Sequence, residues 1–208
     1  MNIFPQKNYK SYNEYAKNYF KELNKVQNKI NLKSITKVSE MLSDCFERQK
    51  RVFVCGNGGS ASISNHLVCD TFKGISQNTS IKPKIISLST NIELITAISN
   101  DINYSDIFIF QLMRLASPDD CLITISSSGN SKNIINAIKW GKKNKINTIS
   151  LNGFDGGKAS KISDISINVP STNYGIVEDS HQSIMHILSQ FTRFKNLDKH
   201  VNFKKINF

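Results

Sequence analysis

The strongest constraint on the fold is the rhythm of apolar residues after residue 50. Stretches of helical periodicity alternate there with five short apolar segments: RVFVC (51–55), KIISL (84–88), CLITI (121–125), NTISL (147–151) and DISINV (164–169). Nearly continuous apolar strands separated by helices are typical of a parallel sheet that is covered on both faces. The sequence therefore predicts an α/β fold with a parallel sheet. Helices are expected at about 60–73, 91–99, 104–116, 131–143 and 177–195.

Two more helices are predicted before the first strand. Apolar residues recur three, four and seven positions apart from Tyr12 to Ile30, and again from Ile35 to Phe46. We expect these helices to form a hairpin over residues 8–49, which either covers the domain or pairs with another subunit. Residues 1–196 are expected to form one domain. Residues 197–208 have no clear period and are expected to be a loose tail.

Composition and charge exclude several classes of protein. No apolar run approaches the ~18–20 residues that cross a bilayer, and the N-terminus lacks the pattern of a secretory signal, so a cytoplasmic protein is expected. The four cysteines have no paired spacing, which indicates reduced thiols rather than a disulfide framework or a Cys-based zinc site. The formal charge is +11, but the lysines are scattered, so nucleic acid is not an expected partner.

The loop after the first predicted strand, Gly56-Asn57-Gly58-Gly59-Ser60, is suited to an anion. Its glycines allow positive φ and a close approach to the backbone, and Ser60 stands where a helix N-cap belongs. The free N–H groups and the dipole at a helix start favour a phosphate. The loop matches neither the P-loop nor the GxGxxG pattern, which disfavours a nucleoside triphosphate or a dinucleotide. An ordinary tight turn is the alternative interpretation.

The third predicted strand ends in a similar loop, Ser126-Ser127-Ser128-Gly129-Asn130-Ser131. Its hydroxyl groups can donate several neutral hydrogen bonds, and a helix follows directly. Open α/β sheets bind ligands at the carboxyl ends of their strands. Together the two loops favour a sugar monophosphate that is bound and released reversibly.

Ionisable side chains gather on two predicted helices. His66 and Asp70 are four residues apart, so they share a helix face and can ligate a metal or form a base with its orienting partner. A histidine with a purely structural role is the alternative. Glu178 and His186 are eight residues apart and point roughly the same way, two turns apart. His181 lies in line with apolar positions, which predicts a packed or interface histidine.

These motifs together resemble a known family. The similarity is to the sugar-isomerase (SIS) domain family and, within it, to the phosphoheptose isomerases. It covers about residues 10–195. The motifs that carry it are GNGGSASISNH (56–66), SNDINYSDIF (99–108), ISSSGNSKNIINAI (125–138), LNGFDGGK (151–158) and the stretch 177–188.

The resemblance implies a flavodoxin-like five-stranded parallel sheet with helices on both faces. It also implies a homotetramer whose active sites are lined by more than one subunit. The implied reaction is the conversion of sedoheptulose 7-phosphate to D-glycero-D-manno-heptose 7-phosphate, through an enediol, for bacterial surface heptose synthesis.

The resemblance also implies roles for individual residues. His186 falls at the family's catalytic histidine, Asp70 where the family has its catalytic glutamate, and Glu178 where it usually has glutamine. In some members the four corresponding positions hold zinc, so His66, Asp70, Glu178 and His186 are the expected ligands of zinc or another divalent cation. The residues implied to bind the substrate are Asn57, Gly58, Gly59, Ser60, Ser126, Ser127, Ser128 and Ser131.

Two departures from the family pattern leave alternatives open. Asp70 is shorter than glutamate by about 1.5 Å, and Glu178 adds a carboxylate, which suits a divalent cation. We expect Asp70, or Glu178 by compensation, to act as base and His186 as acid. The alternatives are an isomerase of another sugar phosphate in polysaccharide synthesis, a non-catalytic sugar-phosphate-binding protein, and a protein associated with the bacterial replication initiator.

Overall fold

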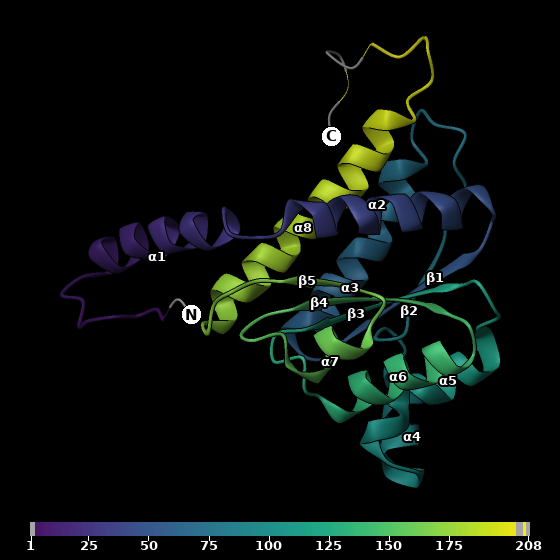
Figure 1. The fold of residues 1–208 in the computed structure, drawn as a ribbon, viewed down its shortest axis with the longest axis horizontal. Coiled ribbons are helices and arrows are strands. Elements are labelled where there is room, and N and C mark those ends of the chain that lie inside the picture. The colour runs from purple at the N-terminus through teal and green to yellow at the C-terminus, as the bar shows by residue number, and fades with distance from the viewer. Residues whose placement is uncertain (1–2, 203–205, 207–208) are drawn as a thin grey trace.

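The computed structural model describes residues 3–202 and residue 206. Its core is a five-stranded, all-parallel sheet in the order β2-β1-β3-β4-β5, which confirms the predicted fold class (Figure 1). The three central strands are buried on both faces, as expected for strands between two helix layers. The strands are β1 (Arg51–Gly56), β2 (Lys84–Ser87), β3 (Cys121–Ser126), β4 (Asn147–Asn152) and β5 (Ile165–Asn168).

Helices cover both faces of the sheet, and two apolar clusters fill the space between the layers (Figure 1). Val52 and Val54 of β1 join the cluster formed with α2, α3 and α8, whereas Phe53 and Cys55 join the cluster formed with α4 to α7. This alternation follows from the two-residue period of a strand. The α-helices are α1 (Tyr12–Gln27), α2 (Leu32–Glu47), α3 (Gly59–Cys69), α4 (Ile92–Asp101), α5 (Ile107–Leu115), α6 (Lys132–Lys143), α7 (Gly157–Ile162) and α8 (Tyr174–Lys195).

Three short elements differ from the prediction. The helix expected over 60–73 becomes α3 followed by the π-helical turn η1 (Asp70–Ile75), and a 3₁₀ turn, η2 (Tyr104–Asp106), precedes α5. Helix α7 was not predicted, because it has only six residues and begins beside two glycines with positive φ, Gly156 and Gly157. Such a short segment shows no helical period.

The two N-terminal helices form as predicted, but they do not fold back on each other. Figure 1 shows α1 extending away from the sheet beyond the end of α2. Helix α1 is attached to α8 instead. Tyr19 donates a hydrogen bond of 2.6 Å from its hydroxyl to Asp179 Oδ2, and Gln27 donates one of 3.0 Å from Nε2 to Ser183 Oγ. This arrangement leaves large side chains of α1, such as Phe20, exposed to solvent.

The C-terminal segment begins beside the loop that follows η1. The backbone N–H of Asp198 donates to the carbonyl oxygen of Asn78 at 2.9 Å. Residues 203–205 and 207–208 of the predicted tail lie outside the described residues. Within the described ranges, no helix combines the length and the apolar character that crossing a membrane requires.

Helix α8 contains a fully buried histidine. His181 is 0% exposed, and its Nε2 lies 3.1 Å from the carbonyl oxygen of Asn152 at the end of β4. Burial disfavours the charged imidazolium and lowers the pKa of His181 to about 4. His181 is therefore a packed, neutral histidine, which confirms the prediction of a packed or interface residue.

We expect acid to destabilise the fold through His181. The pKa in the unfolded chain is about 6.5, so the unfolded state binds this proton first. The free energy of unfolding is then constant above about pH 6.5, decreases as the pH falls toward 4, and levels off below. From pH 7 to pH 5 the loss is about 2 kcal/mol. Urea unfolding should show a shallower pH dependence for His181→Gln, whose amide can still donate to Asn152. The exposed His200→Gln variant is the control, and equal slopes in all three proteins would contradict this role.

Candidate active site

The pairing of β1 with β3 brings the two predicted loops together. Gly56 at the end of β1 lies opposite Ile125 of β3, so the carboxyl ends of both strands lie at the same edge of the sheet. Two reciprocal amide hydrogen bonds join the segments that follow. Asn57 Nδ2 donates to Asn133 Oδ1 at 3.0 Å, and Asn133 Nδ2 donates to Asn57 Oδ1 at 2.9 Å. The hydroxyl of Tyr104, in η2, donates to the same Asn57 oxygen at 2.9 Å.

The loop serines differ in their hydrogen bonds. Ser126 Oγ accepts from the N–H of Gly129, and Ser128 Oγ accepts from the N–H of Asn130, both at 3.2 Å. Ser127 Oγ is buried and has no partner among the described residues. Ser131 stands at the N-cap of α6, but its side chain makes no capping hydrogen bond.

Most buried hydroxyl groups in proteins are hydrogen-bonded, so the orphaned hydroxyl of Ser127 is notable. Water or a ligand would satisfy it. Ser60 is also buried, but it is the second residue of α3 and not its N-cap as predicted, because the N-cap is Gly58. Its N–H donates to the carbonyl oxygen of Asn57 at 3.0 Å. The turn before it requires a glycine at position 58, where φ is +53°.

Glu178 lies at the loop end of α8. Its carboxylate packs against Gly59, the first residue of α3, so closely that a Cβ atom at Gly59 would collide with it. A carboxylate is favourable near a helix N-terminus. Partial burial, with a smaller contribution from Asp179, raises the pKa of Glu178.

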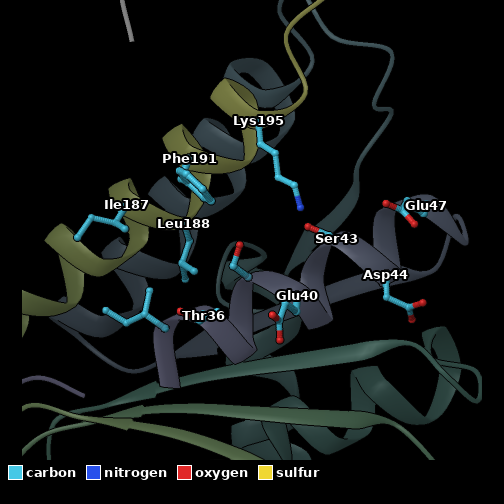
Figure 2. A pocket seen from close by; sticks show the side chains of 11 residues that line it. Thr36, Glu40, Ser43, Asp44, Glu47, Ile187, Leu188, Phe191 and Lys195 are labelled. Carbon is cyan, nitrogen blue, oxygen red and sulfur yellow. The ribbon is translucent and has the colours of Figure 1, made fainter. Parts of the chain in front are cut away.

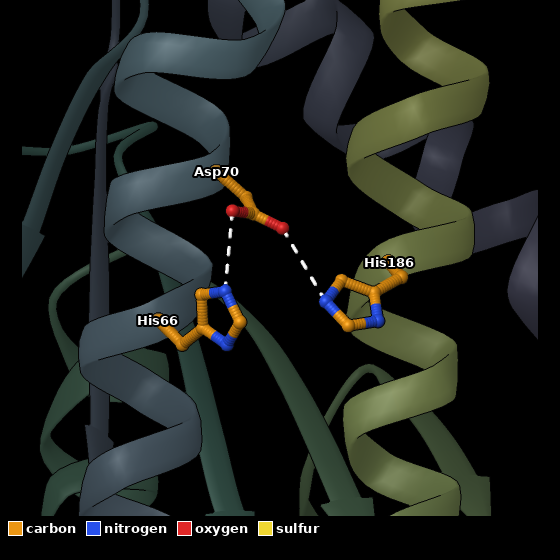
Figure 3. Close-up of side chains that lie close together, drawn as sticks. All are labelled: His66, Asp70 and His186. Carbon is orange, nitrogen blue, oxygen red and sulfur yellow. Dashed lines mark ion pairs between the residues drawn. The ribbon is translucent and has the colours of Figure 1, made fainter. Parts of the chain in front are cut away.

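A second group of residues lies further along α3 and α8. Figure 3 shows the carboxylate of Asp70 between the rings of His66 and His186. Oδ1 of Asp70 is 3.3 Å from Nε2 of His66, and Oδ2 is 3.5 Å from Nε2 of His186. Asp70 is the first residue of the π-helical turn η1, a feature that is frequent at functional sites. The short side chain of Asp70 therefore does reach His186.

Gln182 belongs to the same group, although no sequence motif predicts a role for it. Its Nε2 is 2.6 Å from Nδ1 of His66 and 3.3 Å from Nε2 of His186. An amide N–H that donates to Nδ1 leaves the His66 proton on Nε2, the atom that faces Asp70. The available signal was the spacing, since Gln182 is four residues before His186 and so shares its helix face.

Three of the four predicted metal ligands come together. His66, Asp70 and His186 each offer one ligand atom, and these atoms lie within 4.8 Å of one another. Two imidazole nitrogens and one carboxylate oxygen are a ligand set that suits catalytic zinc. Glu178 is not part of this group. Eight residues before His186 on α8 correspond to about 12 Å along the helix axis, so the predicted four-ligand set does not form within one chain.

The two groups of residues line separate cavities. His66, Asp70 and His186 line a cavity of about 420 Å³, together with residues such as Lys73. Asn57, Ser131 and Asn133 line another of about 580 Å³ at the loops, and no described residue lines both. Along α3, His66 follows Ser60 by six residues, which is about 9 Å of helix.

Comparisons with known proteins agree with this architecture. The sequence model of the SIS domain matches residues 12–153. The phosphoheptose isomerase of Helicobacter pylori (strain P12) is 37% identical over 170 residues, which cover 75% of this chain and 84% of that protein.

Two solved structures are similar over nearly the whole fold. The phosphoheptose isomerase of Neisseria gonorrhoeae has a TM-score of 0.81 and 26% identity, covering 88% of this chain and 98% of that one. The enzyme of Francisella tularensis has the same TM-score and identity, covering 89% of this chain and 100% of its own. This chain therefore belongs to the SIS domain family, in the branch of isomerases formed by the phosphoheptose isomerases.

Proposed function

We propose that this chain converts sedoheptulose 7-phosphate to D-glycero-D-manno-heptose 7-phosphate for surface heptose synthesis. The observation that carries the proposal is the Asp70 carboxylate held between His66 and His186 in a chain of this family. The names of its relatives support the choice of sugar. We also propose that the enzyme is cytoplasmic and that residues 1–196 form one domain.

The proposed reaction needs a base and an acid. A base takes the proton from the carbon beside the carbonyl group, an enediol forms, and the proton returns to the neighbouring carbon. Asp70 acts as this base, and His186 acts as the acid that stabilises the charge that develops on the carbonyl oxygen. His66, oriented by Gln182, holds Asp70 in position.

The loops hold the phosphate in this proposal. Among the described residues the Ser127 hydroxyl has no hydrogen-bond partner and the Ser131 hydroxyl makes no capping bond, and with the other loop residues they form the phosphate site. Binding the remote phosphate orients the reacting end of the sugar. Glu178, which lies beside Gly59, accepts a hydrogen bond from a sugar hydroxyl instead of replacing Asp70 as base.

His186→Ala and Asp70→Asn should each lower kcat at least ~100-fold, because each removes one partner of the proton transfer. Binding of sedoheptulose 7-phosphate should stay nearly unchanged. Solvent deuterium exchange into the sugar, followed by NMR, measures turnover, and calorimetry measures binding. His200→Ala is the matched control. Wild-type turnover in His186→Ala would refute the assignment.

Asp70 stands where the family has a glutamate, and this difference favours a second candidate function, an isomerase of another sugar phosphate. A shorter base reaches a different proton position when the phosphate is held at the same place. The two candidate functions are distinguished by measuring kcat/KM for sedoheptulose 7-phosphate and for shorter ketose phosphates. The substrate with the highest kcat/KM identifies the function. Binding without proton exchange for every sugar would instead favour a non-catalytic binding protein.

His66, Asp70 and His186 form a fitting site for zinc, which would polarise the substrate oxygen when bound. We expect about one zinc per chain by elemental analysis after gel filtration, since three such ligands suffice for a catalytic site. His66→Ala should lose most of this metal, whereas His200→Ala should keep it. Equal metal content in both variants, with activity unaffected by a chelator, would contradict a zinc site here.

We further propose a homotetramer. Helix α1 projects from the domain with Tyr12 and Phe20 exposed, and a groove of about 380 Å³, lined by both apolar and charged side chains, lies between α2 and α8 (Figure 2). Ile187 and Phe191 of α8 line this groove and are half exposed. Large apolar side chains such as those exposed on α1 and α8 are often buried in protein interfaces, and a second copy of the chain is the proposed occupant.

Light scattering should therefore give a mass four times that of the chain. Phe191→Glu should shift the protein to smaller species, because a charge would have to be buried between copies. Ile92→Glu is the matched control, since Ile92 is exposed on α4, on the other face of the sheet. A wild-type protein that is monomeric at micromolar concentration would contradict the proposed assembly.

A further inference from the structure

Lys132 stands where a helix least favours a cation. It is the first residue of α6, and the first turn of this helix contains no acidic residue. The N-terminal end of a helix dipole is positive, so carboxylates are preferred there and lysine is disfavoured. None of the described residues forms an ion pair with Lys132, although Lys142 on the same helix pairs with Asp164. The positive potential at this end of α6 is therefore uncompensated.

Lys132 faces a cavity with polar walls. It lines the cavity of about 580 Å³ at the loops, and it is the one charged side chain among the described residues that do so. The walls are held by the hydrogen bonds that join Asn57 to Asn133 and to Tyr104. A cation lining an otherwise neutral, hydrogen-bonding cavity suits a ligand with a negatively charged end.

The loop before Lys132 contains two hydroxyl groups that do not serve the helix start. Ser131 makes no capping bond, and Ser127 Oγ is buried and unsatisfied in the part of the chain that the structure describes. A capping side chain or a carboxylate would have been the ordinary choice at this helix start. The start of α6 thus lacks both a capping bond and an acidic residue, and a buried hydroxyl nearby is unsatisfied. Such unfavourable features are expected together where residues bind a ligand instead of stabilising the fold.

We propose that Lys132 contacts the phosphate of the substrate and determines the preference of this enzyme for a dianionic ester over a singly charged or neutral sugar. This inference rests on the proposed function and deepens it. An ammonium group recognises phosphate as a point charge. It acts far from the reacting carbon atoms, so it contributes to binding in the ground state and the transition state alike. Lys132 therefore affects KM and leaves kcat unchanged.

The test compares three variants with the wild type. Lys132→Gln removes the charge, Lys132→Arg keeps it, and Lys139→Gln removes an exposed lysine elsewhere on α6. Calorimetry with inorganic phosphate at pH 7.5 should show about tenfold weaker binding for Lys132→Gln, the size of one charge-assisted hydrogen bond. Lys132→Arg and Lys139→Gln should bind like the wild type. With sedoheptulose 7-phosphate, Lys132→Gln should raise KM by a similar factor at constant kcat.

Every outcome of this test either supports or contradicts the role of Lys132. Phosphate binding that is equal in Lys132→Gln and the wild type, or absent from the wild type, would overturn the inference, as would an equal loss in Lys139→Gln. A fall in kcat without a change in KM would also overturn it. If Lys132→Gln weakens phosphate binding but no variant isomerises the sugar, Lys132 is confirmed as the anion contact and the proposed function fails. Thermal unfolding of each variant verifies that it is folded.

Discussion

The parallel pairing of β1 with β3 is the constraint on which the rest of the structure depends. In a parallel sheet every strand must be followed by a crossover, so the chain leaves all strands at the same edge. The Gly-rich and Ser-rich loops are therefore neighbours although about 70 residues separate them in sequence. The reciprocal amide pair of Asn57 and Asn133 then fixes their separation. A pocket held in this way loses little conformational freedom when a ligand binds.

The second constraint is the alignment of α3 and η1 with α8. Contacts occur at successive levels along these helices: Gly59 with Glu178, then His66 with Gln182, then Asp70 with His186. Both helices start near the loops, so a residue that comes later in either helix lies further from the loops. Glu178 belongs to the loop end, and the carboxylate flanked by two imidazoles lies several turns further on.

Strong periodicity made most of the fold predictable. The five strands and the long helices were evident because their apolar residues repeat over many positions. Helix α7 was missed because six residues with adjacent glycines carry no period. The site was partly predictable, since the spacing of His66 and Asp70 identifies one helix face. That they meet His186 depends on contacts between segments more than 100 residues apart, which spacing cannot reveal. Glu178 was placed among the metal ligands by the family resemblance alone, and within this chain it lies about two helical turns from His186, outside the group of His66, Asp70 and His186. Gln182 gave no signal because a lone amide is common on helices.

The hydrogen bond from Tyr19 to Asp179 joins the projecting α1 to the turn of α8 that also carries Glu178. Whatever surface holds α1 in place also restrains the start of α8, and through it the carboxylate beside the Gly-rich loop. If the chain assembles through α1 as proposed, assembly and ligand affinity are thermodynamically linked, and each changes the other by the same free energy. Under the proposed assembly, a change at the α1 interface would therefore be felt at the Gly-rich loop through this one hydrogen bond.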